Sequence, residues 1–240
     1  MKQVTLLKLL MASGLGSRRQ LANAIREGKI KINGEIVENF SQPVDPEEDT
    51  ILINSKPVPL NAKTKLVLML NKPPGVLSTT HDDRRRKTVI DILPQQYHNM
   101  ILYPVGRLDK DTTGLLLLTN DGDLTYRLTH PKFEHEKEYL VSLKTRLNTD
   151  EMLELKRGIC LDDGITRPAE VTECKTGRIY HYSITIHEGR KRQIHRMFGK
   201  LGHHVLALRR IRVGRLTLDN LKEGQVRELS KREIERLLQA

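Results

Sequence analysis

The chain of 240 residues carries 41 Lys and Arg against 30 Asp and Glu, which gives a formal net charge of +11 at pH 7. This excess of positive charge favours a polyanionic partner, of which nucleic acid is the commonest. No apolar stretch is long enough to span a bilayer, and the N-terminus lacks the apolar core of a signal peptide, so we expect a cytoplasmic protein that does not bind a membrane. The length allows one large or two smaller domains.

The cysteines and the aromatic residues are few. Cys160 and Cys174 form neither a close pair nor a cluster with histidine at metal-ligand spacing. We therefore expect reduced thiols and no metal site. Trp is absent, and Phe, Tyr and Trp together make up 4% of the chain. That composition counts against the broad base-stacking surfaces of RNA-recognition and oligonucleotide-binding domains.

The first sixty residues predict a small unit of two short helices and a hairpin. The first helix spans Thr5 to Met11, and Ser17 is a suitable N-cap for a second helix that ends at Gly28. Asn33-Gly34 between short apolar runs predicts a β-hairpin. The polar positions of this unit are basic, namely Lys8, Arg18, Arg19, Arg26, Lys29 and Lys31. We expect these cations to contact RNA; the alternative is a solvated helix face.

The stretch from Leu6 through Ser17-Arg18-Arg19 to Asn33-Gly34 resembles the S-four-type RNA-binding domain. The resemblance covers almost the whole of residues 1–60. A segment rich in Pro, Asn and Lys follows and predicts a linker at 61–65, beginning near Ser55. Residues 66–240 are then expected to form a larger catalytic domain.

The larger part of the chain is dominated by predicted strands. Leu66 to Leu70 is a buried-type strand, and Lys137 to Leu143 and Tyr180 to Ile186 alternate in hydrophobicity as strands do. Arg84 and Arg85 belong to a basic stretch that we expect to form an exposed, phosphate-binding loop. Asp162-Asp163-Gly164 predicts a turn.

One run, Gly106-Arg107-Leu108-Asp109 followed by Thr113-Gly114 and four leucines, places a carboxylate on a constrained loop before a buried strand. Arg107 lies close enough in sequence to keep Asp109 ionised. A carboxylate in such a position is a candidate for catalysis.

A second run, from His187 to Phe198, follows a strand and opens a helix. It supplies Arg190, Lys191, Arg192, His195 and Arg196. Several cations near a helix N-terminus, with no acid among them, suit a phosphate or a catalytic carboxylate. The alternative is a charged outer helix face.

Together these runs resemble the RsuA/RluB/RluE/RluF family of pseudouridine synthases. Lys72-Pro73-Pro74-Gly75, Gly106 to Leu116, Glu136 to Tyr139 and Glu188 to Phe198 fit that family in order and approximate spacing. The resemblance implies an α+β fold with a mixed, mostly antiparallel sheet and flanking helices. It also implies isomerisation of a uridine in ribosomal RNA to pseudouridine by a monomeric enzyme without cofactor or metal. Details of the run from Asp82 to Val89 favour the RluB branch, and so 23S over 16S ribosomal RNA.

By motif position, the resemblance makes Asp109 the nucleophile, Tyr139 the residue that packs on the target base, and Leu208 an apolar lining residue. The chain departs from the family at His195, where Arg or Lys usually pairs with the catalytic aspartate. His195 is our candidate for that pairing, and Arg107, Arg190 and Arg196 are the alternatives. A histidine would make the pairing dependent on pH.

Two other functions compete with this interpretation. Asp109-Lys110-Asp111-Thr112-Thr113 superficially matches the loop of an aspartyl-phosphate phosphotransferase, although Gly106-Arg107 separates it from the preceding strand. The protein could also be a non-catalytic RNA-binding or ribosome-assembly factor. Retention of both Asp109 and Tyr139 argues against that possibility.

Overall fold

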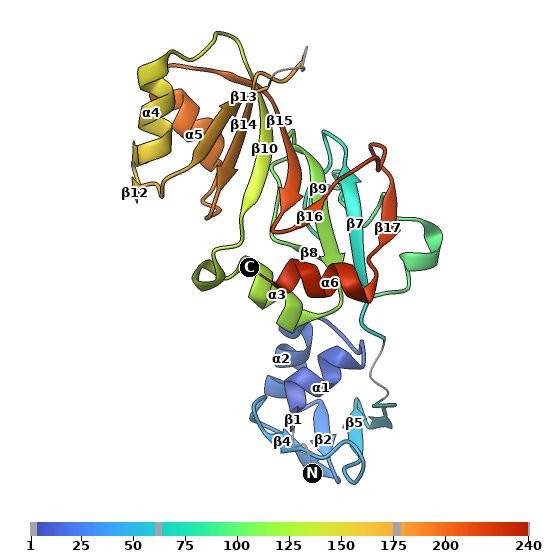
Figure 1. The fold of residues 1–240 in the computed structure, drawn as a ribbon. Helices are drawn as coiled ribbons and strands as arrows, with labels where there is room; N and C mark the ends of the chain where they lie inside the picture. Colours follow the sequence, from blue (N-terminus) through green and yellow to red (C-terminus); the bar gives the residue numbers. More distant parts are fainter. Residues whose placement is uncertain (1–3, 61–63, 175–178, 240) are drawn as a thin grey trace. The chain divides into compact units, whose positions relative to one another are not determined.

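The structure is a computed structural model, which describes residues 4–60, 64–174 and 179–239 (Figure 1). No helix in these ranges is long and apolar enough to cross a membrane.

The residue contacts divide the chain into two compact units. The first unit comprises the described residues up to Lys65 together with Gln96–Ile101, and the second comprises Leu66–Gln95 and the residues from Leu102 onward. Part of the expected linker, residues 61–63, lies outside the described residues.

The first unit, blue to cyan in Figure 1, joins two helices to two small antiparallel sheets. Its elements are β1 (Val4–Thr5), α1 (Leu6–Ala12), α2 (Arg18–Arg26), β2 (Ile30–Ile32), β3 (Glu35–Ile36), β4 (Pro43–Val44), β5 (Ile51–Ile53) and β6 (Lys56–Pro57). One sheet has the order β3-β2-β5-β6, and β1 pairs with β4. Leucines of α1 and the apolar face of α2 pack against β2 and β5 to form the core of this unit.

Local signals explain these elements. The Ser17 side chain accepts from the Gln20 backbone N–H while the Gln20 side chain accepts from Ser17 N–H, a complete capping box at the start of α2. Asn33 and Gly34 both have positive φ angles, 51° and 93°, and form the predicted turn between β2 and β3. The linker, however, begins later than Ser55, because Lys56–Pro57 pairs with β5 as strand β6.

The second unit contains a nine-stranded sheet with flanking helices. Its strands are β7 (Val67–Lys72), β8 (Tyr103–Val105), β9 (Thr113–Thr119), β10 (Lys137–Leu143), β11 (Cys160–Leu161), β12 (Gly164–Ile165), β13 (Glu170–Glu173), β14 (Tyr182–Ile186), β15 (Val205–Val213), β16 (Leu216–Thr217) and β17 (Val226–Glu228). Its helices are α3 (Gly122–Thr129), α4 (Thr149–Arg157), α5 (Gln193–Lys200) and α6 (Lys231–Leu238), with short 3₁₀ turns η1 (Gln95–Tyr97, shared with the first unit) and η2 (Pro131–Phe133).

The main sheet has the order β13-β14-β10-β15-β9-β7-β17, with β16 beside β15 and β8 beside β9. Only the β15–β9 ladder is parallel among the described named strands, so the sheet is mixed and mostly antiparallel, as expected. Two predicted strand limits were wrong. β7 continues beyond Leu70 to Lys72, and β14 begins at Tyr182 rather than Tyr180.

The helices cover the sheet in two groups. Leu124 and Leu128 of α3 and Leu237 of α6 join the apolar side chains of β7 and β9 in one core cluster. At the other end of the sheet, α4 contacts β13 and α5 contacts β15 (Figure 1). This arrangement leaves the loop before β9, strand β10 and the start of α5 to line one cavity.

Candidate active site

Asp109 lies in a tight turn between β8 and β9. The backbone N–H of Thr112 donates to the Asp109 carbonyl at 3.2 Å, which closes the turn. On the other side, the Ser78 hydroxyl donates to the Leu108 carbonyl at 2.9 Å and accepts from Leu108 N–H at 3.1 Å. The backbone around the carboxylate is therefore fixed by hydrogen bonds on both sides, while the Asp109 residue remains partly accessible.

A buried lysine side chain also supports this turn through hydrogen bonds to its backbone. Lys72, at the end of β7, has no exposed surface, and its Nζ donates to the carbonyls of Pro73, Lys110 and Thr112, each at 2.9 Å. Burial lowers the pKa of Lys72 to about 8, while the carboxylates of Asp111 and Asp109 oppose that shift. Lys72 was not among the site residues predicted from the sequence. The available signal was a lysine at the end of an apolar strand, directly before Pro-Pro-Gly.

The turn faces a cavity of about 750 Å³, a size within the usual range of roughly 300–1,000 Å³ for ligand sites. Its lining brings together eight of the residues predicted from the sequence: Arg107, Asp109, Tyr139, Arg190, Lys191, Arg192, His195 and Leu208. Arg84, Arg85 and Arg196 are not part of this lining. The neighbour of the first two, Arg86, does line the cavity and is held by Asp82, with an Nη2–Oδ1 distance of 2.6 Å.

Tyr139 and Leu208 enter the cavity from neighbouring strands, accompanied by Arg210. Tyr139 and Arg210 are 7% and 4% exposed and lie opposite each other in the β10–β15 ladder. Arg210 Nη1 donates to the Tyr139 hydroxyl at 3.4 Å, its guanidinium carbon lies 5.9 Å from the centre of the ring, and its Nε donates to the Leu115 carbonyl at 2.7 Å. Arg210 was not among the residues predicted from the sequence, although its two-residue spacing from Leu208 places both on one face of β15.

His195 lies in the first turn of α5 and is partly buried. Burial and the nearby Arg192 lower its pKa, His204 acts in the same direction, and Asp109 and Asp111 oppose the shift. Its Nδ1 is buried and has no hydrogen-bond partner among the described residues. Within residues 4–60, 64–174 and 179–239, no ion pair shorter than 4.0 Å joins Asp109 to His195 or to an arginine.

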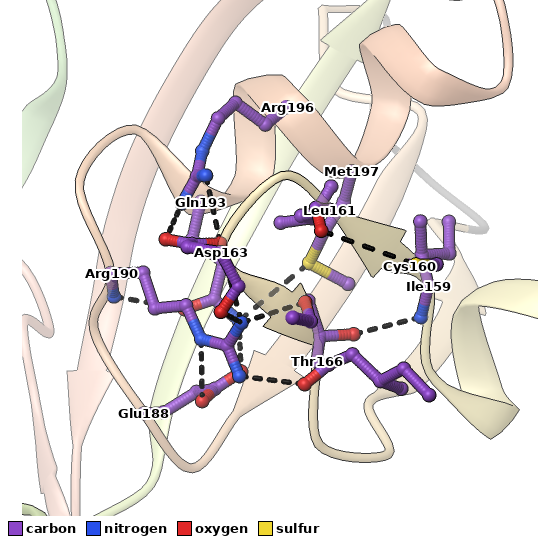
Figure 2. A network of polar contacts seen from close by, with 12 residues as sticks. Ile159, Cys160, Leu161, Asp163, Thr166, Glu188, Arg190, Gln193, Arg196 and Met197 are labelled. Carbon is purple, nitrogen blue, oxygen red and sulfur yellow. Dashed lines mark hydrogen bonds and ion pairs between the residues drawn. The ribbon is translucent and has the colours of Figure 1, made fainter.

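Arg190 and Arg196 have another partner, Asp163, which lies in the turn between β11 and β12 (Figure 2). Both Arg196 terminal nitrogens lie 2.9 Å from Asp163 carboxylate oxygens. Arg190 donates to the carbonyls of Gly164 and Ile165 at 2.8 and 2.6 Å. No acid lies among these cations in the sequence, but the fold supplies one from a turn about thirty residues earlier.

The same network shapes the loop before α5. Arg190 Nε donates to Glu188 Oε2 at 3.1 Å, and Gln193 Nε2 donates to Glu188 Oε1 at 2.7 Å (Figure 2). The Arg190 backbone N–H donates to Gln193 Oε1 at 3.0 Å. These bonds fix the loop while Lys191 and Arg192 remain exposed on it, and Arg192 has a left-handed backbone with φ 48°.

In the first unit, the predicted RNA-contacting cations are mostly at the surface. Lys8, Arg18, Arg19, Arg26 and Lys29 are exposed and Lys31 is partly exposed. Lys29 forms an ion pair with Glu27 at 2.6 Å, and the Arg26 guanidinium donates to the Asn23 side chain at 3.0 Å. In the second unit, Arg84 and Arg85 are exposed on the loop between β7 and η1.

Among the residues that the structure describes, the acidic, histidine and cysteine side chains do not gather into a metal centre. Across the described ranges, no group of three or more His, Cys, Asp or Glu side chains is arranged to hold a metal ion.

Comparisons with known proteins agree on both units. Residues 66–200 match the model of the RNA pseudouridylate synthase family, and residues 4–51 match the S4 domain. The ribosomal large subunit pseudouridine synthase B of Bacillus subtilis (strain 168) is 40% identical over 236 residues, which cover 96% of this chain and 93% of that protein. An uncharacterized RNA pseudouridine synthase of Aquifex aeolicus (strain VF5) is 36% identical over 242 residues, covering 100% of this chain and 96% of its own length.

One solved structure is similar over almost its full length. The match to a pseudouridylate synthase crystal structure covers 98% of this chain and 99% of that one, with a TM-score of 0.69 and 35% identity.

Proposed function

This chain belongs to the RNA pseudouridylate synthase family, and from that premise we propose that it converts a specific uridine of large-subunit ribosomal RNA into pseudouridine with Asp109 as the nucleophile. The observation that carries the proposal is the fixed turn at Asp109, which opens into the cavity that Tyr139 and Leu208 also line. A carboxylate nucleophile needs such a fixed and partly dry position, since the chemistry depends on its orientation toward one atom of the substrate.

The reaction is an isomerisation and balances within the uridine itself. The bond between ribose C1′ and uracil N1 breaks, and a bond between C1′ and uracil C5 forms. The proton on C5 is lost and N1 gains one. Asp109 starts the exchange by attacking either the ribose C1′ or the uracil ring. The detached base must turn before it rejoins, so the uridine has to leave the RNA stack and enter an enclosed cavity.

Tyr139 and Leu208 supply the surroundings of that base. The Tyr139 ring offers a face for stacking, and Arg210 orients its hydroxyl from the neighbouring strand. Leu208 offers an apolar wall. Water exclusion by these side chains strengthens every electrostatic interaction of the carboxylate.

We propose His195 as the positive partner of Asp109 when its imidazole is protonated. The support is its place on the lining of the same cavity and the effect of Asp109 on its pKa. Arg107, exposed on the cavity rim, is the alternative cation. Arg190 and Arg196 are weaker candidates, because Asp163 and Glu188 already bind them.

Two sets of basic residues bind RNA in this proposal: those of the first unit and, in the second unit, the exposed Lys191, Arg192, Arg84 and Arg85. The B. subtilis relative, named for the large ribosomal subunit, supports 23S over 16S RNA as the substrate. We further propose that residues 1–60 anchor the RNA, that 61–65 link them to the catalytic residues 66–240, and that the enzyme acts as a monomer in the cytoplasm.

Replacement of Asp109 by Asn tests the chemistry. The amide is similar in shape but is a poor nucleophile, so the variant should lose isomerisation of a large-subunit ribosomal RNA transcript while keeping its affinity for that RNA. Pseudouridine is detected by its adduct with carbodiimide, which stops reverse transcription. An active Asp109→Asn variant would refute the nucleophile assignment. Mapping pseudouridines in ribosomal RNA from cells with and without the protein identifies the uridine.

A further inference from the structure

An aromatic cluster lies at the end of α3 and in η2, beside the cavity. The Tyr126 ring centre lies 4.8 Å from His130 and 5.9 Å from Phe133, which it meets edge to face. His130 and Phe133 are 6.4 Å apart, and Phe133 lies 6.4 Å from His135. Tyr126, His130 and Phe133 are therefore mutual neighbours with tilted or perpendicular ring planes, and His135 adjoins Phe133.

Packing of the core does not account for this aromatic cluster. Leu124 and Leu128 make up the buried face of α3, whereas Tyr126 points outward and is 48% exposed. Phe133 is partly exposed and His130 is exposed. In a chain with so few aromatic residues, an exposed group of rings is an unexpected feature that the catalytic carboxylate does not explain.

A lysine accompanies the rings. Lys132 Nζ lies 5.2 Å from the Tyr126 ring centre and 4.8 Å from that of Phe133. The Lys132 backbone N–H donates to His130 Nδ1 at 3.2 Å, which orients the imidazole and leaves Nε2 as the donor of the neutral ring. Glu134, the nearest acid in sequence, forms an ion pair with Arg167. The surroundings of the rings therefore favour an anionic ligand.

The aromatic cluster adjoins the cavity. His130, Pro131 and His135 belong to the same lining as Asp109. His135 is 5% exposed and its buried Nδ1 has no partner among the residues described. Tyr126 and Phe133 are not part of that lining, but their rings contact it through His130 and His135.

We propose that the exposed Tyr126 ring, supported by His130 and Phe133, is a stacking platform for an unpaired nucleobase next to the target uridine, with Lys132 bound to the adjoining phosphate. This inference rests on the proposed function and extends it to recognition of the flanking RNA. Stacking of a base on an aromatic ring is stronger than an exposed cation–π contact, so the base displaces the flexible Lys132 side chain from the rings. The released ammonium then lies near the phosphate of the same nucleotide.

Binding of two labelled probes tests the platform: an oligouridine, and an abasic ribose-phosphate strand of the same length. Tyr126→Ala should bind the oligouridine about tenfold more weakly and the abasic strand as the unchanged protein does. Tyr126→Phe keeps an aromatic face for stacking, so this variant should bind the oligouridine as the unchanged protein does. Lys132→Ala should weaken binding of both probes and reduce the slope of log K against log salt by about one. Leu153→Ala, at another exposed apolar side chain, on α4, is the matched control and should change neither.

Kinetics on a large-subunit ribosomal RNA transcript separate this inference from the proposed function. Tyr126→Ala should raise KM while kcat changes little. If the unchanged protein forms no pseudouridine, the proposed function fails. If it forms pseudouridine and Tyr126→Ala has the same KM and probe affinity, only the platform is refuted. Equal weakening for the oligouridine and the abasic strand would also refute it, because the contact would then not involve the base.

Discussion

Tyr139 and Arg210 are direct partners across the β10–β15 ladder, and Arg210 Nη1 donates a hydrogen bond of 3.4 Å to the Tyr139 hydroxyl. The same guanidinium holds the Leu115 carbonyl at 2.7 Å. One buried cation thus ties the aromatic ring of the cavity to strand β9, which follows the Asp109 turn. The relationship makes Arg210 a positioning residue for Tyr139.

We expect the effects of replacing these two residues to be coupled. Arg210→Lys removes the charged donor from Leu115 and should cost about 1–3 kcal/mol of unfolding free energy, whereas Tyr139→Phe, which deletes only one long hydrogen bond, should cost about 0.5–1.5 kcal/mol. If Arg210 acts through Tyr139, the increases in activation free energy that the two variants cause in kcat are not additive in the double variant. Urea unfolding and single-turnover kinetics measure both quantities. Additive losses in kcat would contradict the coupling.

Lys72 supports the Asp109 turn, and its removal should be felt in stability as well as in activity. Lys72→Met leaves the carbonyls of Pro73, Lys110 and Thr112 without their buried donor. The Lys110 carbonyl still accepts from the Gly75 backbone N–H at 2.9 Å, so the carbonyls of Pro73 and Thr112 are the two that become unsatisfied. Each unsatisfied group costs about 1–3 kcal/mol, so we expect a loss of at least ~2 kcal/mol in urea unfolding. Lys110→Met is the matched control, since that side chain is exposed on the same turn. A Lys72→Met protein as stable as the control would show that the lysine does not hold the turn.

His195 should make both stability and catalysis depend on pH. Burial places the folded pKa of His195 below its unfolded value of about 6.5. As the pH falls below about 6.5, the imidazole is protonated more readily in the unfolded chain than in the folded protein. The free energy of unfolding therefore decreases. The stability due to the neutral imidazole is fully present above pH ~6.5 and is lost on acidification.

The comparison of His195→Gln with the unchanged protein isolates this contribution, because all other groups titrate in both. We expect the stability difference between about pH 7.5 and about pH 5.5, which bracket the unfolded pKa, to be smaller in the variant. In catalysis, His195→Arg supplies a permanent charge beside Asp109 and should flatten the rate profile over the same pH range. An unaltered profile in His195→Arg would exclude His195 as the partner of Asp109.

The sequence predicted those features that depend on neighbouring residues. The helix cap at Ser17 and the turn at Asn33-Gly34 form from side chains and dihedral preferences within a few positions, so their patterns were sufficient. The turn at Asp163 was predicted for the same reason. Its ion pairs with Arg196 were not, because the contact spans 33 residues of sequence and depends on how β11 lies against α5.

The candidate site shows the same limit. The resemblance to a family led to Asp109, Tyr139 and Leu208, all of which line one cavity. Lys72 and Arg210, which support these residues, were not predicted, because their roles depend on tertiary packing. Lys72 reaches a carbonyl 40 positions away, and Arg210 reaches a hydroxyl 71 positions away. The hydrophobic pattern of β7 or of β15 alone does not indicate partners so far away in the sequence.

Among the glycines that the structure describes, Gly114 is the one at which the fold should tolerate a side chain least. It has φ +100° at the parallel β9–β15 crossing, where an added Cβ would come within 2.1 Å of the Arg210 carbonyl oxygen. At Gly75, with φ +79°, an added Cβ would meet no atom within 4 Å, so this position serves as a control for backbone strain alone. Gly75→Ala should therefore cost about 1–2 kcal/mol.

Gly114→Ala should cost more than about 4 kcal/mol in urea unfolding, because strand β15 must move away from β9 to make room. That movement displaces Arg210, and with it the hydrogen bond to Tyr139, so activity should be lost even under conditions in which the variant stays folded. A Gly114→Ala protein that loses no more stability than Gly75→Ala would show that β15 can move away from β9 at little cost in free energy. In that case the close approach of β9 and β15 would not be what holds Arg210 in the cavity.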